Sequence, residues 1–185
     1  MTIENKKLIR KHILEKRKNI SKEDKEEKDK IILKRILNSQ EYKEAKKLFI
    51  YVSLKDEVDT IELIKAALRD NKEVFVPYVV SKAEGMIAVN IKSLEDLETG
   101  SYGILEPKDI SKSIKDKTQL DLIIAPAVAI TETGYRIGYG GGFYDRFFQD
   151  IGKDTVAIVI VYKEQITKDI PIESHDYIFD NIIYA

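Results

Sequence analysis

Residues 134–146 form the densest group of positions in the chain that could do chemistry. Five of the nine glycines fall in these thirteen positions, and three of them are consecutive. Glycine reaches positive φ easily and lets a ligand come close to backbone N–H groups. Residues 143–148 then have the pattern of the first turns of a helix. A glycine loop that leads into a helix favours phosphate binding, because free amides and the positive end of the helix dipole point the same way.

Two charged residues flank this loop. Arg136 supplies a cation for phosphoryl oxygens, and Asp145 supplies a carboxylate that could hold Mg²⁺. The segment is not a Walker A loop, since no Gly-Lys-Ser/Thr follows, and its glycine spacing differs from Gly-x-Gly-x-x-Gly. A tight turn with close helix packing is the alternative, but the flanking charges favour an anion site.

A second set of cations lies in a helix predicted to run to about residue 18. With about 100° between successive residues, Lys6, Arg10 and Arg17 fall inside the apolar stripe of this helix rather than opposite it. Two interpretations stay open. Either the long stems cover apolar surface while the heads reach water, or the helix docks beside a ligand and brings cations to it.

Other charged positions are less specific. Residues 53–59 carry three carboxylates directly after a predicted strand, where they could meet a ligand or only complement the dipole of the next helix. Asp176 could be a second metal carboxylate or a turn residue. Lys163 follows another strand and is a candidate for the same cleft, whereas His175 is expected to be a surface loop residue.

Runs of Val, Ile and Leu alternate with helical patterns, which predicts an α/β fold with a mainly parallel sheet covered on both faces. Ligands in such sheets sit beyond the carboxyl ends of the strands, here at residues 53–59, 77–78 and 126–142. Helices are expected at 2–18, from Ser21 onward and from Thr60, as its cap, to Asn71. The predicted strands are 48–53, 73–78, 86–91, 121–125, 155–161 and 177–184, with a connecting loop at 99–118.

Length and composition limit the remaining possibilities. A chain of 185 residues is expected to form a single α/β domain, with the helical segment 1–47 packed on it. Without cysteine there are no disulfides or thiolate sites, and two histidines exclude a multi-histidine metal centre. No apolar run is long enough to cross a membrane and no signal pattern is present, so a cytoplasmic protein is expected.

The N-terminal part is basic. Residues 1–48 carry sixteen Lys and Arg against nine Asp and Glu. A basic helical arm can bind nucleic acid, but a densely charged helix is more often a solvated face.

The glycine segment carries a resemblance to a known family. Its residues, Arg136-Ile-Gly-Tyr-Gly-Gly-Gly-Phe-Tyr-Asp-Arg146, closely resemble the signature of the 5-formyltetrahydrofolate cyclo-ligases, also called methenyltetrahydrofolate synthetases. Residues 6–10 resemble the basic N-terminal motif of that family, and residues 53–60 its Ser-x-x-Asp-Glu segment. Residues 162–166 and the acidic turn at Asp176 follow in the expected order, so the resemblance spans nearly the whole chain.

The resemblance implies a three-layer αβα fold, similar to sugar-phosphate isomerases and CoA transferases. It implies a reaction in which ATP and Mg²⁺ close 5-formyltetrahydrofolate to 5,10-methenyltetrahydrofolate, with release of ADP and phosphate. The catalytic residues would be Arg136, Tyr144 and Asp145, and Asp145 and Asp176 would hold the metal. ATP would bind to Lys6, Arg10, Arg136, Ile137, Gly138, Tyr139, Gly140, Gly141, Gly142, Phe143 and Tyr144. The folate would contact Val52, Glu57, Tyr139, Gly140, Gly141, Gly142 and Phe143.

The residue types suit that reaction. A formamide oxygen is a poor leaving group, and transfer of the γ-phosphoryl group to it would create an iminophosphate that N10 can attack. Such a transfer needs positioning and charge neutralisation rather than a covalent nucleophile. The chain departs from some relatives at Gly141, where they carry Lys, and at Tyr139, where they carry Arg. Lys163, Lys6 and Arg10 are therefore the candidates to meet the γ-phosphate.

Two other functions remain as alternatives. A sugar-phosphate isomerase or acyl-CoA enzyme could share the fold, with Glu57 as its base or nucleophile. A protein that binds nucleic acid through its basic arm would bind with strong salt dependence. The cyclo-ligase is preferred, with small-molecule substrates and without membrane or nucleic-acid partners.

Overall fold

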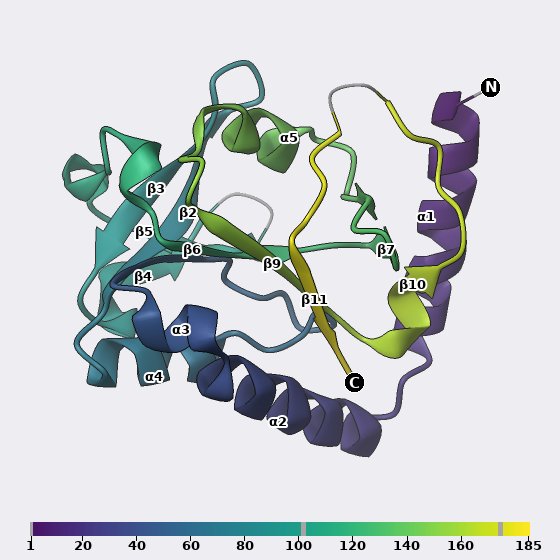
Figure 1. Cartoon of the computed structure of the whole chain (residues 1–185), viewed down its shortest axis with the longest axis horizontal. Helices are drawn as coiled ribbons and strands as arrows, with labels where there is room; N and C mark the ends of the chain where they lie inside the picture. Colours follow the sequence, from purple (N-terminus) through teal and green to yellow (C-terminus); the bar gives the residue numbers. More distant parts are fainter. Residues whose placement is uncertain (1, 101–102, 174–175) are drawn as a thin grey trace.

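The computed structural model describes residues 2–100, 103–173 and 176–185, and its centre is a six-stranded sheet (Figure 1). The strand order is β11-β9-β6-β1-β2-β3. Only the β2–β3 hairpin is antiparallel, so the predicted, mainly parallel α/β sheet is confirmed. The strands are β1 (Lys47–Ile50), β2 (Glu73–Ser81), β3 (Gly85–Ile91), β6 (Leu122–Pro126), β9 (Val156–Val161) and β11 (Asn181–Tyr184). His175 lies outside the described residues.

The central strands are apolar throughout because both of their faces are covered. Leu48, Phe49 and Ile50 of β1 are all fully buried. Successive side chains of a strand point to opposite faces. Leu48 and Ile50 accordingly join one hydrophobic cluster, and Phe49 joins another on the opposite face.

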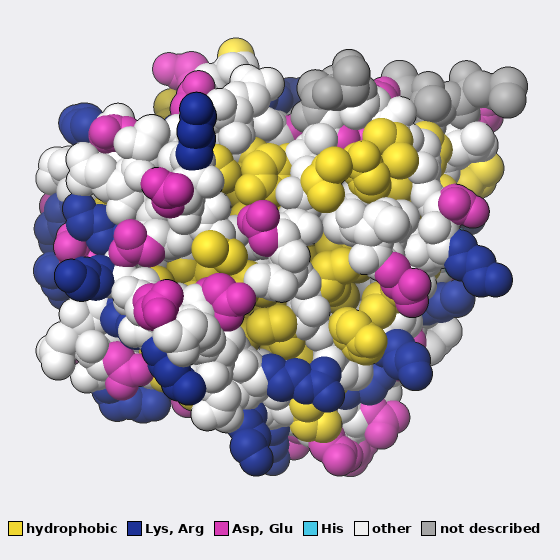
Figure 2. All heavy atoms as spheres, viewed as in Figure 1, with side chains coloured by type: hydrophobic (Ala, Val, Ile, Leu, Met, Phe, Trp, Pro, Cys, Tyr) yellow, Lys and Arg dark blue, Asp and Glu magenta, His cyan; other side chains and the backbone are white. Residues whose placement is uncertain are grey.

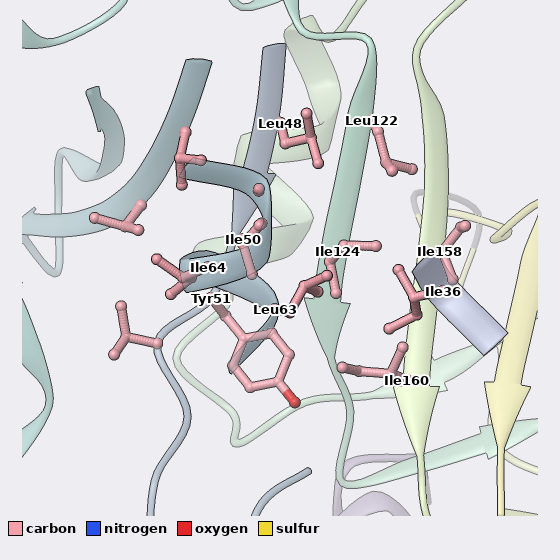
Figure 3. Packing of buried hydrophobic residues seen from close by; sticks show 14 of the residues in the cluster. Ile36, Leu48, Ile50, Tyr51, Leu63, Ile64, Leu122, Ile124, Ile158 and Ile160 are labelled. Atoms are coloured by element: carbon pink, nitrogen blue, oxygen red, sulfur yellow. The ribbon is translucent and has the colours of Figure 1, made fainter. Parts of the chain in front are cut away.

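Three helices cover the first face of the sheet, at the bottom of Figure 1. They are α2 (Lys22–Asn38), α3 (Gln40–Glu44) and α4 (Ile61–Arg69). Ile36 from α2 and Leu63 and Ile64 from α4 pack onto β1, β6 and β9 (Figure 3). The predicted start of α2 is confirmed, since the Ser21 hydroxyl accepts a hydrogen bond from the backbone N–H of Asp24.

The opposite face is covered by the short helix α5 (Phe143–Phe147), at the top of Figure 1. The Phe147 ring stacks on Phe49 of β1, with 4.5 Å between ring centroids. Phe148 stacks on Tyr177 at 4.4 Å. The glycine loop precedes α5 directly, so this aromatic packing attaches the loop to the sheet.

Helix α1 (Thr2–Lys18) stands at one end of the molecule (Figure 1). Its Ile13 is buried against Val128, Ala129 and Ile137. These residues belong to or adjoin a small three-stranded sheet made of β7 (Ala129–Thr131), β8 (Arg136–Ile137) and β10 (Ile166–Thr167). Helix α1 is therefore held beside the segment that leads into the glycine loop.

Several predicted boundaries are wrong. The expected loop 99–118 contains β5 (Leu105–Pro107), which pairs with β4 (Leu97–Thr99), and 3₁₀ turns at Ile110–Lys112 and Lys117–Gln119. These pieces are too short and too polar to show a strand period. The last strand begins at Asn181 rather than at residue 177.

Thr60 stands at the N-cap of α4 as predicted, but its side chain makes no capping hydrogen bond. Its hydroxyl is buried and donates to the carbonyl of Tyr51 at 2.6 Å, so it ties the end of β1 to the start of α4. The Asp59 carboxylate accepts from the N–H of Ile61 at 2.9 Å instead. Asn71 ends the helix as predicted, with a positive φ of 56°.

The basic N-terminal segment is a face of mixed charge. Lys25 pairs with Asp29 on α2 at 2.7 Å, and Lys28 pairs with Glu164. Lys or Arg and Asp or Glu side chains alternate along the lower edge of Figure 2, where α2 lies. This favours the solvated helix face over a nucleic-acid arm. None of the helices in the described ranges is long and apolar enough to cross a bilayer.

The stacked pair that attaches α5 gives a stability prediction. Phe147→Ala should lower the free energy of unfolding by about 3–5 kcal/mol, because a fully buried ring leaves a cavity against Phe49. Tyr184→Ala is the control, since Tyr184 is 42% exposed and its loss should cost about 0.5 kcal/mol or less. Urea unfolding followed by circular dichroism measures both, and equal midpoints would contradict the expectation.

Candidate active site

A cavity of about 480 Å³ opens at the carboxyl ends of β1 and β6. Segments after these strands, the far half of β2, helix α1 and the glycine loop all line it. The lining residues are Lys6, Arg10, Tyr51, Val52, Leu54, Glu57, Pro77, Val79, Met86, Ile104, Glu106, Pro126, Asp176 and the run from Arg136 to Asp145. The three segments expected at the ligand edge each contribute to this one cavity, as parallel topology requires.

Each of three glycines in the loop leaves room for one guanidinium group. A Cβ on Gly138 would lie 2.8 Å from a terminal nitrogen of Arg136. On Gly142 it would lie 3.0 Å from Arg146, and on Gly140 it would lie 3.5 Å from Arg10. Gly140 and Gly142 also have positive φ, of 98° and 65°, which side chains other than glycine rarely adopt. The loop therefore approaches arginines at these three positions, whereas Gly141 lies against the Phe143 ring.

Arg136 is the buried cation of the site, only 8% exposed. Its Nη2 donates to Asp145 at 2.9 Å, and its guanidinium lies over the Tyr144 ring at 5.1 Å. Burial lowers the pKa of Arg136 from its ordinary value, and the Asp145 carboxylate opposes this shift. The Nε atom is buried without a hydrogen-bond partner in the described structure. An arginine remains charged under these conditions, so the group keeps unused donor capacity beside the cavity.

Helix α1 docks at the cavity, as the second of its two interpretations requires. The Lys6 ammonium lies 3.4 Å from Asp176 and 3.2 Å from Glu173. Arg10 donates through Nε to the carbonyl of Gly138 at 2.7 Å. Both side chains line the cavity, whereas Lys163 is exposed and lies outside the lining that the described residues form. Lys163 is therefore the weakest of the cation candidates.

The three carboxylates of residues 53–59 have separate places. Asp59 caps α4, and Asp56 pairs with Arg17 at 2.8 Å. Only Glu57 lines the cavity, where it is 6% exposed. Its Oε1 accepts from the Tyr139 hydroxyl at 2.7 Å, and its Oε2 accepts from the backbone N–H of Leu54 at 2.8 Å. Asp59 thus fits the interpretation as a helix cap, and Glu57 alone is placed where a ligand could reach it.

Tyrosines near Glu57 are kept neutral. Desolvation, together with the Glu57 charge, raises the pKa of Tyr139 and Tyr144 well above the ordinary value. Each therefore retains its proton and can donate one hydrogen bond. Neither can act as a base at neutral pH.

The carboxylates expected to hold a metal line the cavity but are paired with cations. Asp145 accepts from Arg136, and Asp176 accepts from Lys6 and from the backbone N–H of Glu173. No cluster of three or more His, Asp or Glu side chains fit to hold a metal occurs among the described residues. A metal here would need oxygen ligands from a substrate as well.

Comparisons with known proteins identify the family of this chain. A model of the 5-formyltetrahydrofolate cyclo-ligase family matches residues 2–185. The chain belongs to this family. It is 34% identical to a probable 5-formyltetrahydrofolate cyclo-ligase of Caenorhabditis elegans, over 89% of this chain and 85% of that protein.

Solved structures agree as well. The chain is similar to the NMR structure of Aquifex aeolicus 5,10-methenyltetrahydrofolate synthetase, with a TM-score of 0.85 and 28% identity. That match covers 97% of this chain and 89% of that one. A Mycoplasma pneumoniae synthetase has the same fold, with a TM-score of 0.78 at 23% identity, covering 97% of this chain and 98% of that one. The protein is thus a 5-formyltetrahydrofolate cyclo-ligase, an ATP-dependent ligase of one-carbon metabolism.

Apart from Lys163, the cyclo-ligase cavity brings together the residues that the sequence nominates for a role. Lys6 and Arg10 come from α1, Val52 and Glu57 from the segment after β1, and Asp176 from the C-terminal region. The remaining nominated residues are the continuous run Arg136, Ile137, Gly138, Tyr139, Gly140, Gly141, Gly142, Phe143, Tyr144 and Asp145. The structure brings these side chains together, whereas their individual roles stay predictions.

One part of the cavity lining, made of apolar and acidic side chains, was not predicted from the sequence. Val79 and Met86 come from the β2–β3 hairpin, and Glu106 comes from β5. Glu106 is 6% exposed, and its Oε1 accepts from the backbone N–H of Val79 at 3.1 Å. A Cβ on Gly100 would lie 1.9 Å from its Oε2, so that glycine makes room for the carboxylate. A buried Glu in a segment expected to be a loop carries no periodic signal that could have identified it.

The glycine geometry gives a prediction about binding in this cyclo-ligase. Gly140→Ala forces an L-residue to a φ of 98° and places its Cβ against the Arg10 guanidinium. We expect a loss of roughly 1–2 kcal/mol of stability and an approximately tenfold weaker affinity for ATP. Gly103→Ala is the matched control, because its φ is 73° and its Cβ would meet nothing within 4 Å. It should lose stability but not ATP affinity, which calorimetric titration measures; equal affinities of the two variants would contradict the expectation.

Proposed function

We propose that this cyclo-ligase binds the ATP phosphates at the glycine loop and the folate beside Glu57, in one cavity. The observation that carries the proposal is the lining itself. Cations from α1, the glycine loop and the buried Glu57 carboxylate face the same 480 Å³ space. Both ends of the chain contribute to it, through Lys6 and Asp176, which supports a single α/β domain over residues 1–185 with the helical segment 1–47 packed on it. A fold similar to sugar-phosphate isomerases and CoA transferases is part of the same proposal.

The nucleotide end combines three cations with backbone amides. Lys6, Arg10 and Arg136 lie at one wall with the loop that precedes α5. Arg136 already has a fixed position between Asp145 and the Tyr144 ring. Fixed donors that need no reorganisation stabilise charge that develops during phosphoryl transfer. In this scheme Tyr144 acts by holding Arg136 in place, while Ile137, Phe143 and the neighbouring glycines bring the backbone to the nucleotide.

The site fits a magnesium ion delivered with the nucleotide. Mg²⁺ in such enzymes usually takes one or two carboxylates and completes its shell with substrate phosphates and water. Asp145 and Asp176 supply two carboxylates, and each is paired with a cation expected to contact phosphate. When bound, Mg²⁺ would neutralise phosphate charge. Arg136 and Lys6 would then exchange their carboxylate partners for phosphoryl oxygens, so no charge in the site is left unpaired.

Glu57 suits the folate. A carboxylate accepts about four hydrogen bonds, and Glu57 uses one lone pair on each oxygen. Two remaining lone pairs, side by side, match the adjacent N–H donors of an amidine-like pterin edge. Val52 and Tyr139 would enclose the ring system, since both line the cavity next to Glu57.

The chemistry proceeds by activation of the formyl oxygen. The oxygen attacks the γ-phosphorus, the bond to ADP breaks, and an iminophosphate forms on N5. The N10 lone pair then adds to the formyl carbon, N10 loses its proton, and phosphate leaves with the former formyl oxygen. The product carries one carbon between N5 and N10. Arg136, Arg10 and the loop amides would stabilise the transferring phosphoryl group, and the low-polarity walls at Val79 and Met86 would keep competing water away.

The decisive experiment follows the product by absorbance. The protein, 5-formyltetrahydrofolate and Mg-ATP should together generate the methenyl chromophore and release one phosphate per product. Mixtures that lack ATP, or that contain a non-hydrolysable ATP analogue, should generate none. Turnover without ATP would reject the phosphoryl-transfer mechanism.

Asp145 provides the test of the nucleotide end. Asp145→Ala should reduce kcat by about 100-fold or more without unfolding the protein, since it removes a metal carboxylate and the partner that orients Arg136. Asp150→Ala is the control from the same segment, because Asp150 is 77% exposed and contacts only Lys117 among the ion pairs of the described residues. An unchanged kcat in Asp145→Ala would remove Asp145 from the proposed machinery. Arg136→Ala should also remove most turnover.

A further inference from the structure

A chain of three polar side chains links helix α1 to the carboxylate expected to bind folate. Arg17 donates through Nη2 to the Tyr139 hydroxyl at 2.8 Å. The same hydroxyl donates to Oε1 of Glu57 at 2.7 Å. The Arg17 guanidinium also lies 5.7 Å from the centre of the Tyr139 ring. The two bonds join residues far apart in the sequence, on α1, on the glycine loop and after β1.

The direction of this chain is fixed by chemistry. The Arg17 side chain is 2% exposed and has donors only, so the tyrosine oxygen must accept from it. Desolvation and the Glu57 charge keep the phenol protonated. Its single proton therefore goes to Glu57. Because the Tyr139 residue as a whole is 46% exposed, these two bonds are what hold its ring at the cavity wall.

The arrangement also fixes Glu57. With Oε1 held by Tyr139 and Oε2 held by the N–H of Leu54, the carboxylate plane cannot rotate freely. The remaining lone pair on each oxygen is left for a ligand. Loss of the Tyr139 contact would release one oxygen and let the carboxylate turn.

Arg17 does not have the character of a simple anchor for α1. The Arg17 Nε is buried without a partner in the described structure. The carboxylate that pairs with Arg17, that of Asp56, is 40% exposed. An apolar side chain at this buried position would leave no unsatisfied donor. The cation is therefore better explained by what it does to Tyr139 and Glu57.

We infer that Arg17 is a positioning residue for the folate, which acts through the Tyr139 hydroxyl on Glu57. This rests on the proposed role of Glu57. Arg17 touches neither substrate. Arg17 shares one face of α1 with Lys6 and Arg10. The helix would therefore contact the nucleotide through Lys6 and Arg10. It would act on the folate through a relay, namely the hydrogen bonds from Arg17 to Tyr139 and from Tyr139 to Glu57.

The test compares Arg17→Met, Tyr139→Phe and the double variant, with Lys16→Met as an exposed control on the same helix. Arg17→Met and Tyr139→Phe should each raise the KM and the Kd for 5-formyltetrahydrofolate about tenfold, the effect of losing one charged hydrogen-bond link. The double variant should be no worse than either single one, because both remove the same link. In Arg17→Met the KM for ATP should change less than about twofold, and Arg17→Lys should recover part of the folate affinity.

Different results separate the inference from the proposed function. Folate affinity in Arg17→Met equal to that of Lys16→Met would overturn the role of Arg17. So would a double variant whose losses multiply, since Arg17 would then act independently of Tyr139. If Arg17→Met does not fold by circular dichroism, Tyr139→Phe decides alone, and an unchanged folate affinity there overturns the relay. The Kd for folate is measured by calorimetry, which needs no turnover. An inactive wild type that binds folate would therefore contradict the proposed reaction but not the relay.

Discussion

The close approach of the glycine loop to arginine side chains is the constraint on which the site depends. At Gly138, Gly140 and Gly142 the space that a Cβ would occupy is next to a guanidinium group. Two of the three also have positive φ. A loop with ordinary side chains would push the cations away or expose them to solvent. Glycine here serves the placement of charge as much as the conformation of the backbone.

Holding these cations in a buried site requires partners. Arg136 is buried against Asp145 and two aromatic rings, and Lys6 lies against carboxylates of the C-terminal region. Removing a charge from water costs several kcal/mol unless it is paired, so the acidic and basic residues of the site must occur together. Lys6 and Arg136 are thus each paired with a carboxylate of the cavity wall, and in the proposed scheme both members of each pair serve Mg-ATP.

The fold supplies the framework for this pairing. The parallel strands β1 and β6 end at the same edge, so the segments after them meet the glycine loop there. The Phe49–Phe147 stack attaches the loop and α5 to the sheet. Helix α1 is held at the site by tertiary contacts, among them the packing of Ile13 near β7 and β8 and the hydrogen bond from Arg10 to Gly138. Because the site includes residues of α1, it forms only while the contacts that dock α1 are intact.

Hydrophobic runs were enough to predict the parallel sheet, and the glycine spacing was enough to predict a loop that leads into a helix, whereas the individual site residues came from the resemblance to the family. These features are local: a buried strand is apolar over its own length, and a glycine loop before a helix has its chemistry in consecutive residues.

The different contacts of Asp56, Glu57 and Asp59 could not be predicted from local sequence. All three are carboxylates in one short segment, and only the positions of Arg17, Tyr139 and α4 decide what each one does. Likewise Glu106 became a cavity residue only because a short polar hairpin pairs and buries it. The sequence by itself thus determined which charged and polar side chains the site can use. Tertiary structure decided which of them pair with one another. Hydrogen bonds and ion pairs between distant segments depend on distances that no local pattern encodes.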